Sequence, residues 1–390
     1  MKRKTIAALL ALVVHALVVA GCWDRTEVND LAIITAAGLD LTEDRELEIT
    51  VKIYLTSPSS QQEMQFGAGG GGIGLSVVRA AKGKTMADAV SKLQEVISRD
   101  VFWGQDEVFI FGERLARAGI AEPLDFLTRH PAPRERANVF VSKGRARDVL
   151  ELNPRIDRSI ADALKEMAGN RTGLDITLKE LEQMMAGKSK AAVIPMVEIV
   201  PKGDNQSSFA FIRGTAVLKN GRMIAYADDH VTRGIMWLRN EVREDTVTVS
   251  PDDGEGHVSV KFLRNRVRLI PHIDGDRWSM TVRIDGQDEI IENTTNLDYS
   301  IPKHIGSLQA ALENDINERI RHALRMAQEK WNADVFRFAD AFYRKYPKEW
   351  KRSMARWDEI FPKVEVTLQT GMTVRKPGLV GKNIFKPDQR

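Results

Sequence analysis

The side chain with the most distinctive chemistry in this chain is the thiol of Cys22, because no other cysteine occurs among the 390 residues. A lone cysteine cannot form a disulfide within its own chain, so its thiol is either modified or buried. The small residues Val19, Ala20 and Gly21 stand immediately before it, and a signal peptidase requires small residues at these positions. We therefore predict cleavage between Gly21 and Cys22 and a covalent lipid on the Cys22 sulfur.

Residues 1–21 have the organisation of a signal peptide that would bring Cys22 to a membrane. A cationic start, Lys2-Arg3-Lys4, precedes an apolar run over residues 5–20. As a helix this run would measure about 24 Å, which is too short to span about 30 Å of hydrocarbon permanently. The alternative is a plain secretory signal followed by an unmodified cysteine. The order small-small-Gly-Cys resembles the bacterial lipobox, however, and this implies a lipoprotein held at the membrane surface by two or more acyl chains.

A search for catalytic or metal-binding residues gives one cluster, Asp228-Asp229-His230. These side chains could bind a metal ion, but they also suit the start of the helix expected to follow, where acidic groups interact with the positive end of the helix dipole. We favour the helix cap. The other histidines are scattered, and the motifs H-E-x-x-H and G-x-S-x-G are absent. The sequence therefore predicts no enzymatic activity, no metal ion and no cofactor other than the lipid on Cys22.

Two features that could indicate a phosphate-bearing partner have simpler explanations. Residues 67–72 satisfy the pattern G-x-G-x-x-G, but a polar segment precedes them and a strand-like segment follows, so we predict a flexible loop over residues 57–74. The 57 basic residues exceed the 54 acidic ones by three, and the three cations of the signal peptide account for this excess. The mature chain is therefore neutral, and we predict no nucleic-acid partner.

The hydrophobic pattern predicts an α+β protein with mixed sheets, packed helices and two to three domains after the signal peptide. We place an N-terminal α/β domain at residues 22–203 and a C-terminal α+β domain at residues 204–375, because the polar segment 201–206 is the strongest break in composition. Residues 376–390 are expected to form a loose tail.

Local patterns specify several elements within both domains. Alternating apolar and polar residues from 47 to 55 predict a strand with one buried face. Asn220-Gly221 and Asp274-Gly275 each separate two strand-like runs and predict hairpins. One apolar stripe predicts a long, core-packed helix from residue 305 to 331, and the aromatic stretch 334–361 predicts two further helices separated by a proline.

Four residues are candidates for a structural role or for a surface that binds a partner: Trp103, Gly104, Arg233 and Trp237. Trp103 and Gly104 stand at the junction of a strand and a turn, where glycine permits backbone angles or close contacts denied to other residues. Arg233 and Trp237 belong to a helical stretch with several apolar side chains, so part of its surface must be buried. We expect Trp237 in the core, and we leave both roles open for Trp103.

Four separated blocks resemble the Ger(x)C family, the lipoprotein C subunits of bacterial spore germinant receptors. The blocks are Gly21-Cys22-Trp23-Asp24 to Asp40, Gly83-Lys84-Thr85 through Phe102-Trp103-Gly104 to Gly112-Glu113, Gly214-Thr215-Ala216-Val217 through Thr232-Arg233-Gly234 to Trp237-Leu238, and the long C-terminal helix with its aromatic sequel. They span nearly the whole mature chain. The chain departs from the family at Gln105, where histidine is frequent, at His230 and Val231, where acids are frequent, and at Arg337 and Ala339, where glycines are frequent.

The resemblance implies a lipoprotein on the outer face of the cytoplasmic membrane, which in the spore is the inner membrane. Its implied partners are membrane lipid and the integral-membrane subunits of a receptor that senses nutrients, and contact of this subunit with the nutrient stays open. One alternative is an extracytoplasmic solute-binding lipoprotein of a transporter, which would need a ligand cleft between two similar lobes. Another is a membrane-anchored hydrolase, for which the sequence offers no nucleophile or metal set.

Overall fold

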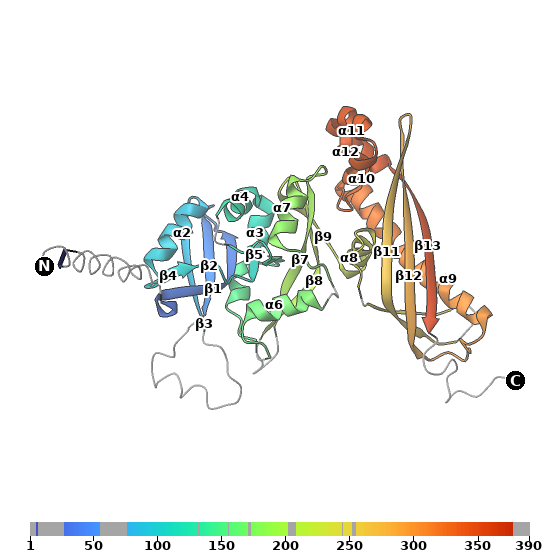
Figure 1. Ribbon diagram of the computed structural model, residues 1–390, viewed down its shortest axis with the longest axis horizontal. Helices are drawn as coiled ribbons and strands as arrows, with labels where there is room; N and C mark the ends of the chain where they lie inside the picture. Colours follow the sequence, from blue (N-terminus) through green and yellow to red (C-terminus); the bar gives the residue numbers. More distant parts are fainter. Residues whose placement is uncertain are drawn as a thin grey trace.

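The computed structural model describes residues 5–6, 27–54, 76–130, 133–154, 156–170, 173–201, 208–243, 245–251 and 255–376. Gly21, Cys22, the glycine-rich loop 57–74 and the tail beyond residue 376 lie outside the described residues. Within them the chain forms two β-sheets with packed helices (Figure 1). This is the α+β fold that the sequence predicts.

The first sheet contains nine strands in the described part of the chain, in the order β3-β2-β1-β5-β6-β7-β8-β9, with β4 paired to β1. Its central strands β1, β5, β6 and β7 run parallel, and antiparallel pairs flank them on both sides. The strands are β1 (Leu31–Leu41), β2 (Leu47–Tyr54), β3 (Ser76–Gly83), β4 (Asp100–Phe102), β5 (Val108–Gly112), β6 (Asn138–Ser142), β7 (Ala191–Val200), β8 (Phe209–Lys219) and β9 (Arg222–Ala227).

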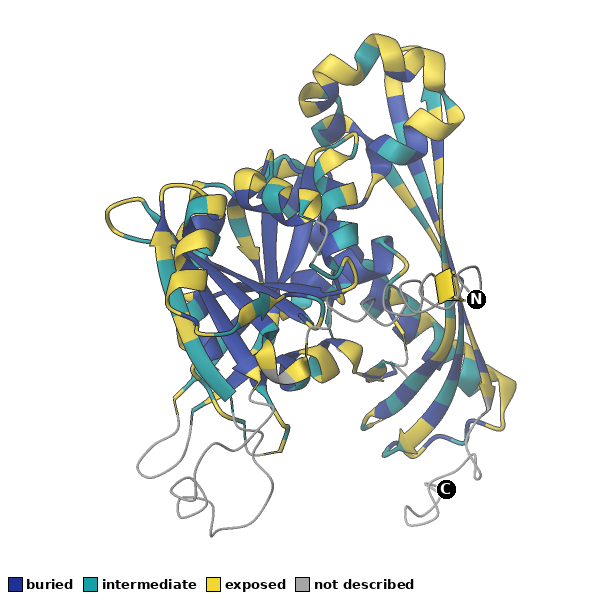
Figure 2. Ribbon diagram, turned by 60° about the vertical axis from the view of Figure 1, so that its left-hand side comes forward, coloured by how far each residue is buried: buried dark blue, intermediate teal, exposed yellow. Residues whose placement is uncertain are grey.

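Helices cover both faces of the first sheet, which is why every residue of the central strands β5 and β6 is buried. One face packs against α5 (Ala146–Leu150) and α6 (Ile160–Gly169). The other packs against α2 (Met86–Glu95), α3 (Glu113–Ala118), α4 (Ala121–Arg129) and α7 (Leu178–Ala186). The strands of this sheet are consequently dark blue over most of their length in Figure 2.

The strand expected over residues 47–55 is β2, but its alternation does not separate a core face from a solvent face. Its polar residues Glu48, Thr50 and Lys52 are buried as well, because α5 packs over them. The alternation of apolar and polar residues predicts the strand β2 correctly, but it does not predict that α5 covers the polar side of this strand. The charged groups on this side are therefore part of the protein interior.

Two charged side chains from neighbouring strands hold the ends of α5. Asp40 of β1 accepts hydrogen bonds from the backbone N–H groups of Ala146 and Arg147 at 2.9 and 3.0 Å. Lys52 of β2 donates from Nζ to the Leu150 carbonyl oxygen at 2.9 Å. The anion thus meets the positive end of the helix dipole and the cation meets the negative end.

The second sheet has four strands in the described part of the chain, in the order β10-β11-β12-β13. The predicted hairpin at Asp274-Gly275 joins β11 to β12, and Gly275 adopts the left-handed backbone (φ 59°) that its turn requires. Figure 2 shows buried and exposed residues alternating along these strands, because helices cover only one face. The strands are β10 (Thr246–Val249), β11 (Val258–Asp274), β12 (Arg277–Asn293) and β13 (Glu365–Lys376).

The predicted long helix is α9 (Pro302–Arg325), which continues as a π-helical turn over Met326–Trp331. It buries one apolar stripe against the second sheet: Leu308, Leu312, Ile316, Ile320 and Leu324. The aromatic stretch that follows forms α10 (Phe338–Lys345), α11 (Pro347–Ser353) and the short α12 (Trp357–Ile360), with α10 and α11 divided at Pro347. Their rings pack around Trp278 of β12, whose ring centroid lies 4.7 Å from that of Phe342.

The boundary expected between residues 203 and 204 stays a prediction, and the division between the two sheets lies further along the chain. The expected boundary falls between β7 and β8, which pair antiparallel with each other from Ala191 to Lys219. The first sheet therefore continues through β9, and α8 (Asp229–Leu238) leads to the second sheet. A polar segment is typical both of a domain linker and of a connection between paired strands, so composition alone does not distinguish them.

Candidate functional site

Trp103 and Gly104 lie in a turn after β4 that Arg134 holds in place. The Trp103 side chain is buried, with 6% of its surface exposed. Arg134 donates from Nε to the Gly104 carbonyl oxygen at 2.5 Å and from its backbone N–H to Asp106 at 3.2 Å. A Cβ on residue 104 would lie 2.6 Å from the ring of Phe102, an exposed side chain that would have to move to make room for it. The turn is a packed structural feature, held by the buried Trp103 and by the hydrogen bonds from Arg134.

Asp106 anchors this turn from the protein interior. Its side chain is fully buried, and burial raises the pKa of the carboxyl to about 7, although the Arg134 backbone N–H favours the ionised form. A carboxyl with a pKa near neutrality could transfer protons. Its carboxylate instead accepts the Arg134 backbone N–H on both oxygens, which fits a role in holding the turn.

The helix that carries Arg233 and Trp237, α8, lies between the two sheets and contacts both (Figure 1). Thr232 Oγ1 donates to Thr215 Oγ1 of β8 at 3.0 Å, which ties α8 to the first sheet. Trp237, 3% exposed, meets the Phe262 ring of β11 edge-on with the centroids 5.2 Å apart, which ties α8 to the second sheet. One helix therefore joins both halves of the fold.

Gly234 allows α8 to approach α9 closely. A Cβ at this position would lie 2.3 Å from the Arg319 carbonyl oxygen and 2.7 Å from Ala323 Cβ. The adjacent Arg233 forms an ion pair with Asp245, just before β10, and burial together with the nearby Arg319 charge lowers the pKa of Arg233. The sequence Thr232-Arg233-Gly234 thus makes three different connections through three consecutive residues.

The Asp228-Asp229-His230 cluster forms the N-terminus of α8, as the sequence predicts. Asp228 accepts a hydrogen bond from the Val231 backbone N–H at 2.8 Å. His230 Nδ1 lies 3.1 Å from His322 Nδ1 of α9, a contact that no local pattern could reveal because 92 positions separate the two residues. Within the described residues, no three histidine, cysteine, aspartate or glutamate side chains are arranged to hold a metal ion.

The structure does not bring the candidate residues together into one site. The turn at Trp103 and Gly104 follows β4, which pairs with β1 of the first sheet, whereas Arg233 and Trp237 lie on α8 between the two sheets (Figure 1). Both indoles are buried, so neither presents an exposed ring to a partner. A role of these four residues in partner binding therefore stays a prediction.

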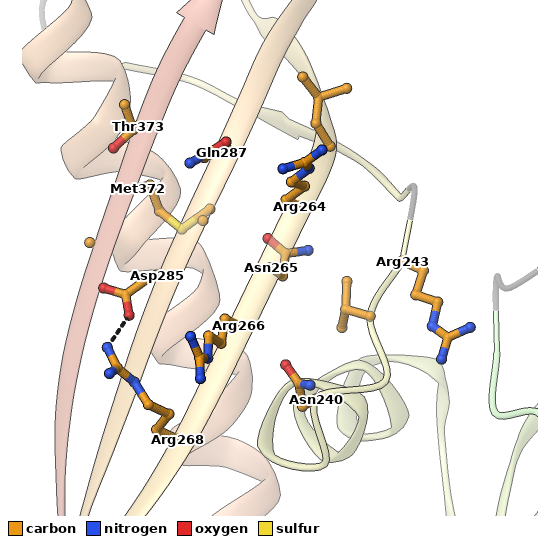
Figure 3. Close-up of a pocket in the computed structure, with 14 residues that line it drawn as sticks. Asn240, Arg243, Arg264, Asn265, Arg266, Arg268, Asp285, Gln287, Met372 and Thr373 are labelled. Atoms are coloured by element: carbon orange, nitrogen blue, oxygen red, sulfur yellow. Dashed lines mark hydrogen bonds and ion pairs between the residues drawn. The ribbon is translucent and has the colours of Figure 1, made fainter.

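An arginine-lined pocket of about 910 Å³ lies beside α8, on the face of the second sheet that no helix covers (Figure 3). Three arginines reach it from alternate positions of β11, and Asp285 and Gln287 reach it from β12. Asn240 and Arg243 stand on the opposite side, on the segment that follows α8. Sequence reasoning missed this pocket, although Arg264, Arg266 and Arg268 show the period of two that places side chains on one face of a strand.

Two families of spore germination proteins match successive parts of the chain. The family described as "Spore germination protein N-terminal domain" matches residues 24–199, and the family described as "Spore germination B3/ GerAC like, C-terminal" matches residues 213–378. The chain is thus a two-part spore germination protein. Among the described residues, no helix has both the length and the apolar character needed to cross a bilayer.

Full-length relatives agree with both matches. The chain is 28% identical to the putative spore germination protein YfkR of Bacillus subtilis, over 98% of this chain and 99% of the relative. It is 25% identical to spore germination protein KC of the same organism over the full length of both. The crystal structure of the GerBC protein superposes with a TM-score of 0.56 at 14% identity, over 90% of this chain and 100% of that chain, which shows a shared fold. The chain belongs to the Ger(x)C family, and the predicted resemblance is confirmed.

Proposed function

We propose that this protein is the lipid-anchored subunit of a spore germinant receptor, where it binds and signals together with integral-membrane subunits. The observation that carries the proposal is similarity along the whole chain. Spore germination proteins KC, B3 and A3 each match between 96% and 100% of it. Relatives that share both halves support a shared role more strongly than a match to one half would.

The anchor in this proposal is a lipid on Cys22, after cleavage behind Gly21, on the outer face of the cytoplasmic membrane of the spore. The export signal and the small residues before Cys22 support it. The strand β1 begins at Leu31, nine positions after Cys22, and nine extended residues span at most about 30 Å. The start of the first sheet would therefore lie close to the bilayer, within reach of integral-membrane subunits.

Signalling requires that a contact on one half of the protein affects the other half. The helix α8 fits this role, because Thr232 joins it to the first sheet and Trp237 joins it to the second. A solute-binding protein with a cleft between two similar lobes fits less well. The first sheet is large, mixed and covered on both faces, whereas the second has four described strands and one covered face.

The anchor is tested by Cys22→Ser, because serine offers no thiol for acylation. We expect this change to abolish metabolic labelling with radioactive palmitate and to release the protein from washed membranes. The matched control adds Ser57→Cys to the variant, which restores one thiol at another position and should not restore labelling. Undiminished labelling of Cys22→Ser would refute the anchor.

The receptor role is tested separately by cross-linking intact spore membranes and identifying the proteins that co-purify with the full chain. We expect integral-membrane germinant receptor subunits among them, and we expect their yield to fall with Cys22→Ser. A chain that is lipidated but captures no such subunit would refute the receptor assignment and leave the anchor intact.

A further inference from the structure

The arginine-lined pocket carries more positive charge than the described acidic side chains that line it can balance. Arg268 forms an ion pair with Asp285 at 2.7 Å, the pair drawn as a dashed line in Figure 3. Arg264 and Arg266 take part in the backbone ladder with β12, but their side chains and that of Arg243 form no ion pair or hydrogen bond with other described residues. Asp285 is the only acidic residue among the described residues that line the pocket. Within the described part of the chain, three arginines that line this pocket therefore have no carboxylate partner.

The register of the strands explains why these charges share one face. Arg264 lies opposite Gln287 and Arg266 lies opposite Asp285 in the β11–β12 pair, so all four side chains leave the sheet on the same side. Like charges two positions apart on one strand face repel each other. This arrangement does not favour stability by itself, so the arginines are better explained by a ligand.

Protection of a sheet edge is the simplest alternative explanation for arginines on an outer strand. The outer edge of β11 is free beyond the residues that pair with β10, but it is blocked by other means. Asn240 Oδ1 accepts the Val267 N–H at 2.8 Å, and Pro271 has no N–H to offer a new strand. The arginine side chains project from the face of the sheet and line the pocket, so edge protection does not account for them.

The donor groups indicate the chemistry of the ligand. Each guanidinium presents up to five N–H donors in a planar fork, which matches the oxygens of carboxylates and phosphates. The three guanidinium groups without an ion-pair partner offer more N–H donors than the two oxygens of one carboxylate can accept. A phosphate monoester has three terminal oxygens and can accept more of these hydrogen bonds. The pocket volume lies within the range of about 300–1,000 Å³ that is typical of small-molecule sites.

We propose that this pocket binds a phosphate group, carried either by a soluble phosphate ester or by a lipid headgroup. Arg264 and Arg266 hold the phosphate oxygens, Arg243 adds positive charge from the segment after α8, and Asp285 neutralises the charge of Arg268. The binding site lies on the second sheet and is separate from the lipid attachment at Cys22. The proposal does not depend on the receptor role.

The test is isothermal titration of the full chain, in an uncharged detergent, with inorganic pyrophosphate as the probe. We expect Arg264→Gln combined with Arg266→Gln to weaken binding at least about tenfold, because each lost charged hydrogen bond to an anion typically has an effect of this order. The matched control, Arg79→Gln with Arg222→Gln, removes the same charge from exposed strand positions of the first sheet and should change the affinity less than about twofold. Asp285→Asn should increase the affinity, because it frees Arg268.

Further measurements separate the outcomes. An equal loss of pyrophosphate affinity in the pocket variant and in the control would show general charge attraction and overturn the proposal. The absence of binding at millimolar pyrophosphate would also overturn it. Succinate that binds as tightly as pyrophosphate would overturn the assignment to phosphate. Tighter binding of dihexanoyl phosphatidylglycerol than of glycerol 3-phosphate would assign the site to lipid, and the reverse would assign it to a soluble ester. If the glutamine variant fails to fold, Arg264→Lys with Arg266→Lys keeps the charge and still removes the forks.

Discussion

Asp288 of β12 is a buried carboxyl whose removal should stabilise the protein. Its side chain is fully buried on the face of the second sheet that packs against α9, and neither carboxylate oxygen has a hydrogen-bond partner among the described residues. Burial raises the pKa of this carboxyl from 3.8 to about 7. We expect Asp288→Asn, which has nearly the same shape and no charge, to increase the free energy of unfolding at alkaline pH.

The magnitude follows from the two pKa values. A carboxyl with a higher pKa in the folded state contributes stability that is complete below pH 3.8 and is lost as the pH rises through 7. The full loss is the difference between about 7 and 3.8, at about 1.36 kcal/mol per pH unit, or about 4 kcal/mol. About 2 kcal/mol of it has been lost at pH 5 and nearly all of it at pH 8. The advantage of the asparagine variant should therefore grow by about 2–3 kcal/mol between these two pH values.

Urea unfolding at pH 5 and pH 8, followed by tryptophan fluorescence, measures this change. Four of the seven tryptophans (278, 331, 350 and 357) lie in the half of the protein that contains Asp288. The matched variant is Asp106→Asn, because the pKa of Asp106 is also raised to about 7 but this carboxyl accepts the Arg134 backbone N–H. It should show the same pH trend and a loss of about 1–3 kcal/mol at pH 5. An Asp288→Asn advantage that is equal at both pH values would refute the reasoning.

Two further predictions concern α8 and the buried tryptophans. Gly234→Ala should lower the free energy of unfolding by about 1–3 kcal/mol, because its Cβ would collide with the Arg319 carbonyl group of α9. Gly306→Ala in α9, where nothing lies within 4 Å of the added Cβ, should be neutral or stabilise by up to about 1 kcal/mol in the same urea melts. Trp103→Ala and Trp237→Ala should each cost about 3–5 kcal/mol in urea melts. A tryptophan variant that melts like the wild type but no longer captures the membrane subunits would indicate a partner surface instead.

Sequence patterns predict the fold well where one interaction decides the structure. The glycine turns at 220–221 and 274–275 specify their hairpins, and the stripe along α9 specifies its buried side. Burial of Lys52 and Asp40 could not be predicted in this way. It depends on α5, whose first residue lies about a hundred positions further along the chain, and local alternation contains no information about that contact.

The candidate sites show the same difference between features that local sequence predicts and features that depend on contacts between distant segments. The sequence identifies Trp103, Gly104, Arg233 and Trp237 as candidates for a structural role or a partner surface. Three of them attract attention through a large aromatic or a charged side chain, and Gly104 through its backbone freedom. It does not reveal the arginine-lined pocket, because the neutral overall charge hides a local excess and because Arg243 reaches the pocket only through the path of the chain after α8. The period of two from Arg264 to Arg268 was the available signal. Its meaning depends on which face of β11 remains uncovered.

The packing of α8 against both sheets has a mechanical consequence. One continuous set of buried side chains extends from Ala32 of β1 through Trp237 to Val374 of β13, without a solvent-filled gap between two separate cores. Bending the protein between its sheets would separate these packed side chains and expose apolar surface to water, which is energetically unfavourable. A force applied to one sheet would therefore move both sheets together. A protein built in this way responds by changing its orientation and not its shape.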